Sequence, residues 1–356
     1  FREDIWSINN RRPAEVKFTD SLIKDSLRRD FTINSIYYDV ENDKYIDPNL
    51  WIKDIENDVI KFIGNIEDRI EEDSLRILRF IRIKNRYNLK VLDENYYTIL
   101  KNKIHLLNNL PTERLRQEFD KILIWNNNII AIQELKDIWF LKIFLPEVDI
   151  LETIPWNKWH LEWDVWIHTK MCIEELNKKR KRGELSDFTK TEQLTLYWTI
   201  LLHDIAKYNT LSIDDNGEAH YFNHENIGSE IFDKDLSLRL LFSNNQKKEI
   251  SWIIKNHLKL FLIPDMRILK SRKLMMNKYF SKLLVIWEVD NKWRIPAKLD
   301  KFNEIKKIYS DFLYILKNKL FLTGDDIIKK YPDLEWHKIW EKLEILNNEI
   351  LINDKK

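Results

Sequence analysis

The sequence predicts a mostly helical protein that begins with a small strand-containing unit. Residues 14–18 and 32–40 alternate apolar and polar side chains or run β-branched and aromatic, which is typical of strands in a small sheet. Asp47-Pro48-Asn49 predicts a turn that closes this unit. From about residue 66, apolar residues recur at helical spacing, and helical patterns continue to the C-terminus. The first helical stripe consists of Ile70, Leu75, Leu78, Ile81 and Ile83.

Composition narrows the class of protein. The chain has 356 residues, 44% hydrophobic and 33% charged, which is enough for two or three globular domains. Its one cysteine, Cys172, excludes a disulfide framework, and no run of about 18 apolar residues predicts a membrane span. We therefore expect a cytoplasmic protein without a membrane partner. The net charge of +1 gives no whole-chain attraction to polyanions, so nucleic-acid binding would need local basic surfaces.

A first group of chemistry-bearing residues lies at positions 28–35, RRDFTINS, ahead of a predicted strand. The guanidinium forks of Arg28 and Arg29 suit a triphosphate, and the Asp30 carboxylate can accept a hydrogen bond from a ribose hydroxyl. An isolated RRD tripeptide is also typical of a solvated charged turn. The tripeptide alone therefore leaves both interpretations open.

A second group lies at positions 72–79, EDSLRILR. Asp73 and Arg76 are three residues apart in a predicted helix, so they should share one face. A carboxylate acceptor beside a guanidinium donor fits the amino group and ring nitrogen that cytosine and adenine share. The alternative is an ordinary ion pair worth about 0.3–0.5 kcal/mol. Arg79, Arg82 and Arg86 continue a basic stripe that faces either RNA phosphates or solvent.

Both groups resemble motifs of the class II tRNA nucleotidyltransferase and poly(A) polymerase family. The resemblance implies the remnant of a nucleotidyltransferase α/β head over residues 1–63 and an all-α neck over 64–150 that binds RNA and nucleotide. An all-α HD domain would follow over 151–300, and a C-terminal helical segment over 301–356. The resemblance assigns nucleotide binding to Arg28, Arg29, Asp30, Asn34, Asp73, Arg76 and Arg79.

Two further segments extend this resemblance. Positions 111–118, PTERLRQE, resemble the motif that braces the neck, which gives them a structural role. Positions 201–207, LLHDIAK, resemble the HD doublet segment, except that Ala206 stands where that family usually has glycine.

Histidines and aspartates gather around that doublet, since six of the eight histidines lie between residues 160 and 257. Imidazoles and carboxylates together suit Mn²⁺, Ni²⁺, Co²⁺ or Fe²⁺. The resemblance implies hydrolysis of 2′,3′-cyclic phosphates and 2′-nucleotides, with Lys207 binding phosphate. We expect His160 and His220 to lie outside the ligand set. The metal ligands implied are His168, His203, Asp204, His224, His257 and Asp290.

The catalytic part of the family pattern is missing from this sequence. In that family, two aspartates after a glycine-rich loop hold Mg²⁺ for attack by the RNA 3′ hydroxyl. Neither element occurs here, so no catalytic residue for nucleotide addition is assigned, and we expect the chain alone not to add nucleotides.

Three functions remain open on this pattern. The preferred one is the C-terminal portion of an enzyme that adds C and A from CTP and ATP to tRNA, with its head segment encoded separately or absent from this sequence. A stand-alone, RNA-binding HD phosphohydrolase is the first alternative, and a non-enzymatic tRNA-binding scaffold is the second. Neither the oligomeric state nor the choice among CCA, C, A and poly(A) addition is readable from the sequence.

Glycine is scarce and tryptophan is abundant. Average usage near 7% would give about 25 glycines, but the chain has 5 glycines and 14 tryptophans. We hypothesise that the organism reads UGA as glycine and that these codons were translated as tryptophan; genuine tryptophans in a divergent paralogue are the alternative. Glycine allows a positive φ that an indole-bearing residue resists. The tryptophans at positions where the family typically has glycine are Trp51, Trp139, Trp163, Trp293, Trp336 and Trp340.

Overall fold

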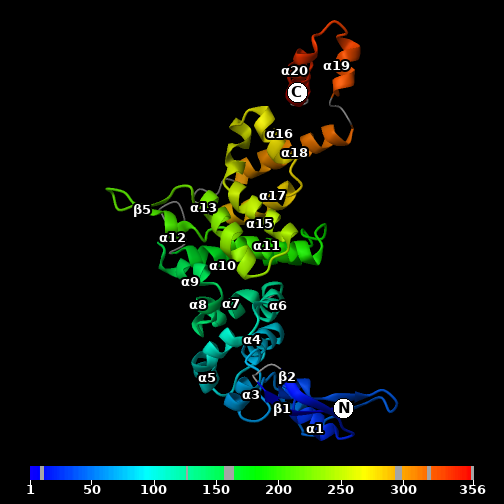
Figure 1. Ribbon diagram of the computed structural model, residues 1–356, viewed down its shortest axis with the longest axis vertical. Coiled ribbons are helices and arrows are strands. Elements are labelled where there is room, and N and C mark those ends of the chain that lie inside the picture. The colour runs from blue at the N-terminus through cyan, green and yellow to red at the C-terminus, as the bar shows by residue number, and fades with distance from the viewer. Residues whose placement is uncertain (9–11, 126, 156–163, 293–298, 319–321, 354–356) are drawn as a thin grey trace.

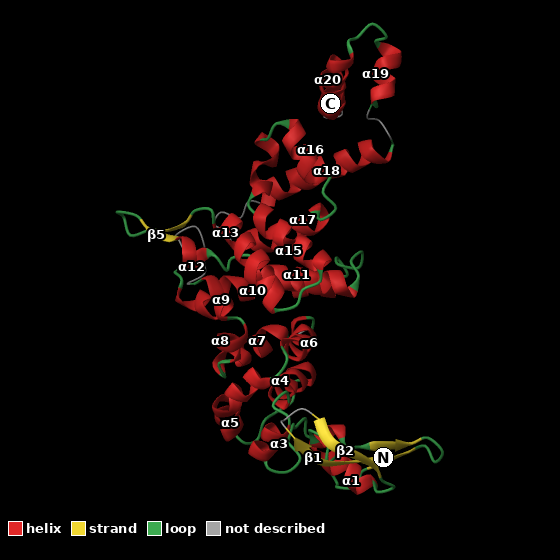
Figure 2. Cartoon of the chain, in the orientation of Figure 1, coloured by secondary structure: helices red, strands yellow, loops and turns green. Residues whose placement is uncertain are grey.

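The computed structural model is an elongated and mostly helical molecule, as Figures 1 and 2 show, which confirms the fold class predicted from the sequence. It describes residues 1–8, 12–125, 127–155, 164–292, 299–318 and 322–353. The N-terminal strands lie at one end of the long axis and the last two helices at the other. None of the helices so described combines the length and apolarity that crossing a membrane requires.

The N-terminal unit consists of two antiparallel hairpins and two short helices. The predicted strand at residues 14–18 is confirmed within the first hairpin, which pairs Arg2 with Phe18 and Ile8 with Arg12. The predicted turn is also confirmed, because Asp47 accepts hydrogen bonds from the backbone N–H groups of Asn49 and Ile52. The elements are β1 (Arg2–Ile8), β2 (Arg12–Phe18), α1 (Leu22–Leu27), β3 (Tyr37–Asp39), β4 (Lys44–Ile46) and α2 (Ile52–Glu56).

The prediction of one strand over residues 32–40 was wrong. Thr32–Asn34 forms a single 3₁₀ turn, and only Tyr37–Asp39 is a strand. The Asp30 carboxylate accepts from the backbone N–H of Phe31 and from the Asn34 amide, both at 3.0 Å. These local side-chain bonds give the backbone an alternative to a sheet ladder, so they override the strand propensity of the segment.

An aromatic cluster joins the N-terminal unit to the first long helix. Phe31 lies 4.9 Å from Phe62 between ring centroids, and Phe62 lies 5.4 Å from Phe80 of α4. All three rings are buried. Because Phe31 directly follows Asp30, this packing fixes the backbone of residues 28–30 against the helical neck.

Helices α3 to α9 form the neck below the centre of the molecule in Figure 1. The stripe predicted from Ile70 to Ile83 is buried throughout, as expected. It spans two helices instead of one, because the backbone at Asp73 is extended and separates α3 from α4. The neck helices are α3 (Ile66–Glu72), α4 (Arg76–Tyr87), α5 (Asn95–Lys103), α6 (Thr112–Leu123), α7 (Asn128–Asp137), α8 (Phe140–Phe144) and α9 (Pro146–Asp149).

A larger helical body follows the neck. Its helix α11 begins at a capping box in which Thr189 and Glu192 satisfy each other's backbone N–H groups. The only strands in the described part of this body are β5 and β6, which form a protruding hairpin. The body comprises α10 (Val165–Lys181), α11 (Lys190–Leu202), α12 (Lys207–Thr210), β5 (Leu211–Ile213), β6 (Ala219–Tyr221), α13 (His224–Ile231), α14 (Ser237–Arg239), α15 (Asn244–Asn256), α16 (Ile268–Met275) and α17 (Phe280–Asn291). The chain ends with α18 (Leu299–Lys317), α19 (Gly324–Lys330) and α20 (Trp336–Asn353).

A buried arginine connects the neck to this body. Arg116 of α6 donates to the carbonyl of Leu240 at 2.8 Å, and its guanidinium lies 3.8 Å from the ring centroid of Phe242. It also lies 3.6 Å from the Asp120 carboxylate one turn along the helix. These contacts agree with the structural role predicted for residues 111–118.

Of the four suspect tryptophans that the structure describes, one has the backbone of a glycine. Trp139 precedes α8 with a φ of 70°, in the left-handed region. Trp51 has a φ of −89°, and Trp336 and Trp340 lie in α20. Trp163 and Trp293 lie outside the described residues. The recoding hypothesis therefore stays a prediction, with backbone support at Trp139 alone.

Replacing Trp139 with glycine should stabilise the protein by about 0.5–1 kcal/mol, because glycine occupies the left-handed region without a Cβ penalty. The ring is half exposed and covers little apolar surface, although its contact with the Lys101 ammonium at 4.2 Å would be lost. Differential scanning calorimetry would measure the change in Tm. Trp340→Gly is the matched control: it removes an exposed tryptophan from a helix interior and should lower stability. A lower Tm for both variants would contradict the prediction.

Candidate functional site

The two arginines of the RRD motif share one carboxylate. Arg28 donates to one oxygen of Asp25 at 2.5 Å, and Arg29 donates to the other oxygen at 3.0 Å. The hydroxyl of Tyr37 also donates to Asp25, at 2.7 Å. Asp25 is buried, and the sequence prediction missed it, although its positions three and four residues before the arginines are the spacing of an ion pair on a helix. A triphosphate bound here would meet guanidinium groups that are already held in place.

Asp30, Asn34 and Arg79 lie in contact with one another. The buried Asp30 carboxylate accepts from the Asn34 amide with one oxygen. Its other oxygen lies 2.5 Å from the guanidinium of Arg79 on α4. This contact is ionic, because that oxygen accepts no hydrogen bond of good geometry among the described residues. Asp30 thus links the first motif to the second across the junction of head and neck.

Arg69, which the sequence prediction also missed, makes a second link. Its guanidinium donates to the backbone carbonyls of Arg28 and Arg29, and its own carbonyl accepts from Arg76 at 2.6 Å. Arg76 pairs with Glu72 at 2.8 Å, and its buried Nε has no partner among the described residues. A long-range contact of this kind leaves no signal in the spacing of residues along the chain.

Asp73 and Arg76 do not share a helix face, so that prediction was wrong. Asp73 lies in the extended junction between α3 and α4, where its carboxylate accepts from the backbone N–H of Leu75 at 3.3 Å. Its charged partner, at 3.8 Å, is Arg114. The ordinary ion pair that we considered as the alternative is not formed either. The carboxylate is about one quarter exposed and can still reach a ligand.

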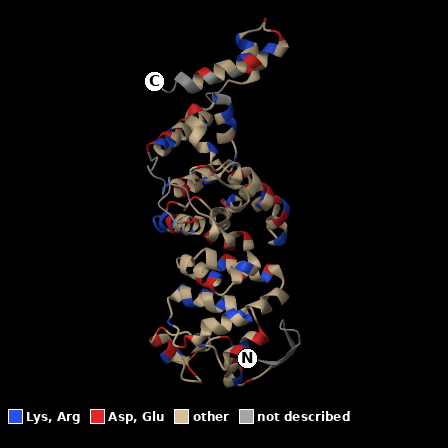
Figure 3. Cartoon of the chain, turned by 90° about the vertical axis from the view of Figure 1, so that its left-hand side faces the viewer, with Lys and Arg blue, Asp and Glu red and all other residues tan. Residues whose placement is uncertain are grey.

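The basic stripe on α4 is mostly neutralised. Arg79 pairs with Asp30, and Arg82 pairs with Glu118 at 2.8 Å. Arg86 instead lies over the ring of Trp125. Figure 3 shows Lys and Arg distributed along the molecule together with Asp and Glu, in keeping with the net charge of +1.

The six predicted metal ligands converge in the helical body. His168 comes from α10, and the His203-Asp204 doublet follows α11. His224 begins α13, His257 follows α15, and Asp290 comes from α17. All six side chains are buried. The site is therefore built from five helices that are far apart in the sequence.

The donor atoms of these residues face one another. The Nε2 atom of His224 lies 3.3 Å from both Asp204 and the Nε2 atom of His257. The Nε2 atom of His203 lies 3.1 Å from Asp204, and that of His168 lies 3.0 Å from Asp290. These spacings allow one cation to contact ligands from several helices at once.

Three of the histidines are oriented for metal binding by the backbone. The Nδ1 atoms of His203, His224 and His257 each lie 2.7 Å from a carbonyl oxygen three residues earlier. This contact fixes the proton on Nδ1 and leaves the Nε2 lone pair free. The buried Nε2 of His203 has no hydrogen-bond partner among the described residues, so the donor set fits a transition-metal ion.

The electrostatics of the cluster differ from one histidine to another. Burial opposes ionisation of Asp204, but His203 and Lys207 outweigh it and hold the pKa of Asp204 well below its usual value. Burial also opposes a charge on His203, but the Asp204 and Asp290 carboxylates raise its pKa to about 10. Burial and the charges of His224 and His203 lower the pKa of His257 to about 3. Without a cation the cluster thus combines ionised carboxylates with a protonated His203 and a neutral His257, and a bound metal ion would take the place of the Nε2 proton of His203.

Further residues border this cluster. The Lys207 ammonium lies 2.6 Å from Asp204 and is nearly buried. The Cys172 thiol lies 3.4 Å from the Nε2 atom of His168; the sequence prediction missed it, although its i+4 spacing was a signal. Ala206 is fully buried with a right-handed backbone, so this position does not require glycine. His220 pairs with Asp214 on the hairpin outside the cluster, as expected, and His160 lies outside the described residues.

Comparison with protein-family models gives three matches along the chain. The Poly A polymerase head domain matches residues 1–61. The model described as the probable RNA and SrmB-binding site of polymerase A matches residues 92–151, and the HD domain matches residues 164–283. The HD match covers five of the six predicted ligands, since only Asp290 lies beyond it.

Curated relatives point in the same direction. The chain is 37% identical to the CCA-adding enzyme of Ligilactobacillus salivarius over 137 residues, which are 38% of this chain and 33% of that protein. It is 34% identical to the Multifunctional CCA protein of Tolumonas auensis over 195 residues, which are 53% of this chain and 44% of that protein. The chain thus spans less than half the length of these relatives.

Solved structures share the fold. An apo form of a CCA-adding enzyme matches 98% of this chain and 72% of its own, with a TM-score of 0.64 and 19% identity. A tRNA nucleotidyltransferase complexed with a primer tRNA and an incoming ATP analogue matches 80% of this chain and 74% of its own, with a TM-score of 0.54 and 18% identity. With the three family matches in this order, the chain belongs to the class II tRNA nucleotidyltransferase and poly(A) polymerase family and carries an HD domain.

Proposed function

We propose that this chain supplies the nucleotide-binding and tRNA-binding parts of an enzyme that adds C and A to tRNA from CTP and ATP. One observation carries the proposal: Arg69 and Arg79 join the RRD segment to the α3–α4 junction. Arg69 holds the backbone of Arg28 and Arg29, and Arg79 holds Asp30. The groups proposed to bind phosphate and those proposed to recognise the base would therefore hold fixed positions relative to one another, where the N-terminal unit meets the neck.

Base selection in this proposal belongs to Asp73 and Arg76. The partly exposed carboxylate would accept from the amino group of cytosine or adenine. The Arg76 guanidinium is buried against Glu72 and the carbonyl of Arg69, so it must exchange one of these contacts to donate to the neighbouring ring nitrogen.

The roles of Arg28, Arg29, Asp30 and Asn34 would be to hold the triphosphate and the ribose. No residue of this site is assigned to the binding of the Mg²⁺ that nucleotide addition uses.

Equilibrium binding of the four nucleoside triphosphates tests base selection. The chain should bind CTP and ATP more tightly than UTP and GTP. Asp73→Asn replaces an acceptor oxygen with a donor in the same shape, so it should weaken CTP and ATP binding by about tenfold. Asp68→Asn, an exposed aspartate on α3, is the matched control and should change nothing. Equal binding of all four nucleotides by the unmodified chain would refute base selection at this site.

A second activity, phosphohydrolysis by the HD domain, is favoured by the six buried histidines and aspartates that converge in the helical body. We call these six residues the ligand cluster. His168, His203, Asp204, His224, His257 and Asp290 are the residues that would hold Mn²⁺, Ni²⁺, Co²⁺ or Fe²⁺. When bound, a divalent cation polarises a phosphoester and offsets its charge. Lys207 would bind a phosphate oxygen of the substrate, for which it must exchange its contact with Asp204.

Hydrolysis of 2′,3′-cyclic AMP by protein dialysed against each metal in turn tests this activity. Conversion above the metal-free level is expected for at least one cation. A cluster that binds metal but hydrolyses neither cyclic phosphates nor 2′-nucleotides would leave the HD domain with a structural role.

A further inference from the structure

One arginine of the basic stripe is held by an aromatic ring and not by a carboxylate. The guanidinium of Arg86 lies 3.8 Å from the ring centroid of Trp125. Across the part of the chain that the structure describes, no carboxylate lies within ion-pair distance of Arg86, in contrast to Arg79 and Arg82. A cation–π contact orients a guanidinium but does not neutralise it. Arg86 therefore keeps its charge for an anion from outside the chain.

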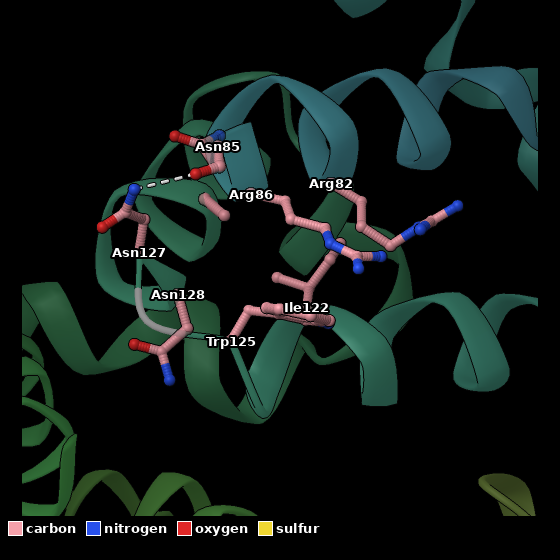
Figure 4. Close-up of a pocket in the computed structure, with 8 residues that line it drawn as sticks. Arg82, Asn85, Arg86, Ile122, Trp125, Asn127 and Asn128 are labelled. Atoms are coloured by element: carbon pink, nitrogen blue, oxygen red, sulfur yellow. Dashed lines mark hydrogen bonds between the residues drawn. The ribbon is translucent and has the colours of Figure 1, made fainter. Parts of the chain in front are cut away.

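Arg86 and Trp125 border a small pocket between the end of α4 and the start of α7, shown in Figure 4. Asn85, Asn127 and Asn128 form its polar side, and the Asn127 amide donates to the carbonyl of Asn85 at 2.8 Å. The interior of the pocket has a volume of about 10 Å³, which is room for about one water molecule. An anion would therefore bind at the mouth of the pocket, where the Arg86 side chain is exposed.

The backbone around the pocket also favours an anion. Asn127, Asn128 and Ala131 belong to the first turn of α7, a helix of 10 residues. The N-cap residue, Asn127, makes no side-chain hydrogen bond to that turn. The positive end of the helix dipole therefore adds to the charge of Arg86 at this pocket.

We propose that Arg86, positioned by Trp125, binds a backbone phosphate of the RNA at the mouth of this pocket. The proposal rests on the tRNA binding proposed above and names one contact within it. The α6–α7 side of the pocket lies in residues 92–151, which match the probable RNA-binding model, so we favour an RNA phosphate over a free one. Arg79 and Arg82, whose charges are already compensated, serve to hold α4 in place.

Titration of the full chain with tRNA that lacks its 3′ CCA, at a series of KCl concentrations, tests the proposal. Arg86→Gln should weaken binding about three- to tenfold at 0.1 M salt. It should also reduce the slope of log Kd against log salt by about one, because one phosphate contact is lost. Trp125→Leu should weaken binding and leave the slope nearly unchanged, since the charge remains but its orientation is lost. Arg86 is exposed, so folding of the glutamine variant is not at risk.

Lys234→Gln is the matched control. It removes one exposed charge that pairs with Glu230 on the HD domain, and it should alter neither affinity nor slope. An equal loss in both glutamine variants would show an effect of net charge and overturn the proposal. Unchanged affinity in Arg86→Gln, or weaker binding with the original slope, would also overturn it. If the unmodified chain binds no tRNA, the proposed tRNA binding itself fails, and that outcome is distinct from the others.

Discussion

Replacing Asp204 with alanine should abolish tight binding of a divalent metal, with a loss of affinity of about 100-fold or more. One oxygen of Asp204 lies 3.1 Å from the Nε2 atom of His203, and the other lies 3.3 Å from that of His224. The carboxylate therefore lies between two imidazoles of the ligand cluster, one that follows α11 and one that begins α13. Residues that only hydrogen-bond to a metal ligand already contribute about 10- to 100-fold in metal affinity, so loss of a residue that contacts the metal itself should cost at least as much. Elemental analysis after equilibrium dialysis against Mn²⁺ or Ni²⁺ measures the result.

The β5–β6 hairpin provides the control for this prediction. Asp214, Glu218 and His220 form a second group of potential ligands there, in which Asp214 lies 3.0 Å from the Nε2 atom of His220. Unlike the ligand cluster, this group is partly exposed, so Asp214→Ala should leave the metal content unchanged. Because alanine at Asp204 removes a carboxylate that lies 2.6 Å from the nearly buried Lys207 ammonium, Asp204→Asn should be tested too. Full metal content in both Asp204 variants would contradict the site.

The ligand cluster was predictable because the His203-Asp204 doublet and the concentration of histidines are both visible in the sequence. The geometry was not predictable, since five helices bring the six side chains together. The orientation of three imidazoles also depends on carbonyl contacts that form only at helix ends. The resemblance to the HD domain implied the six members of the set, and packing determines their arrangement.

The errors at the nucleotide site have local causes. Residues 32–34 have strand-like side chains, but hydrogen bonds to Asp30 hold them in a turn. A signal for the break at Asp73 was present, because the stripe steps by five residues from Ile70 to Leu75 where a helix would step by three or four. In contrast, Glu118 and Trp125, the partners of Arg82 and Arg86, depend on contacts between elements, so the sequence could not separate neutralised arginines of the basic stripe from free ones.

Replacing Arg116 with alanine should lower the free energy of unfolding by about 2–4 kcal/mol, because it removes the buried partner of the half-buried Asp120 carboxylate and leaves the Leu240 carbonyl without its donor. The transition midpoint in urea, followed by circular dichroism, measures the loss. The Arg116→Ala, Asp120→Asn double variant is the control: it leaves no buried charge and should recover part of the stability.

The loss in Arg116→Ala should also depend on pH. Burial raises the pKa of Asp120, and Arg116 opposes that rise. Without Arg116, the pKa of Asp120 in the folded protein should rise further above its unfolded value of 3.8. Between those two values the folded state binds more protons than the unfolded state, so stability falls as pH increases. The deficit relative to the unmodified chain should therefore be larger at pH 7 than at pH 4. An equal deficit at both values would show that lost packing on Phe242, and not the charge of Asp120, is the cause.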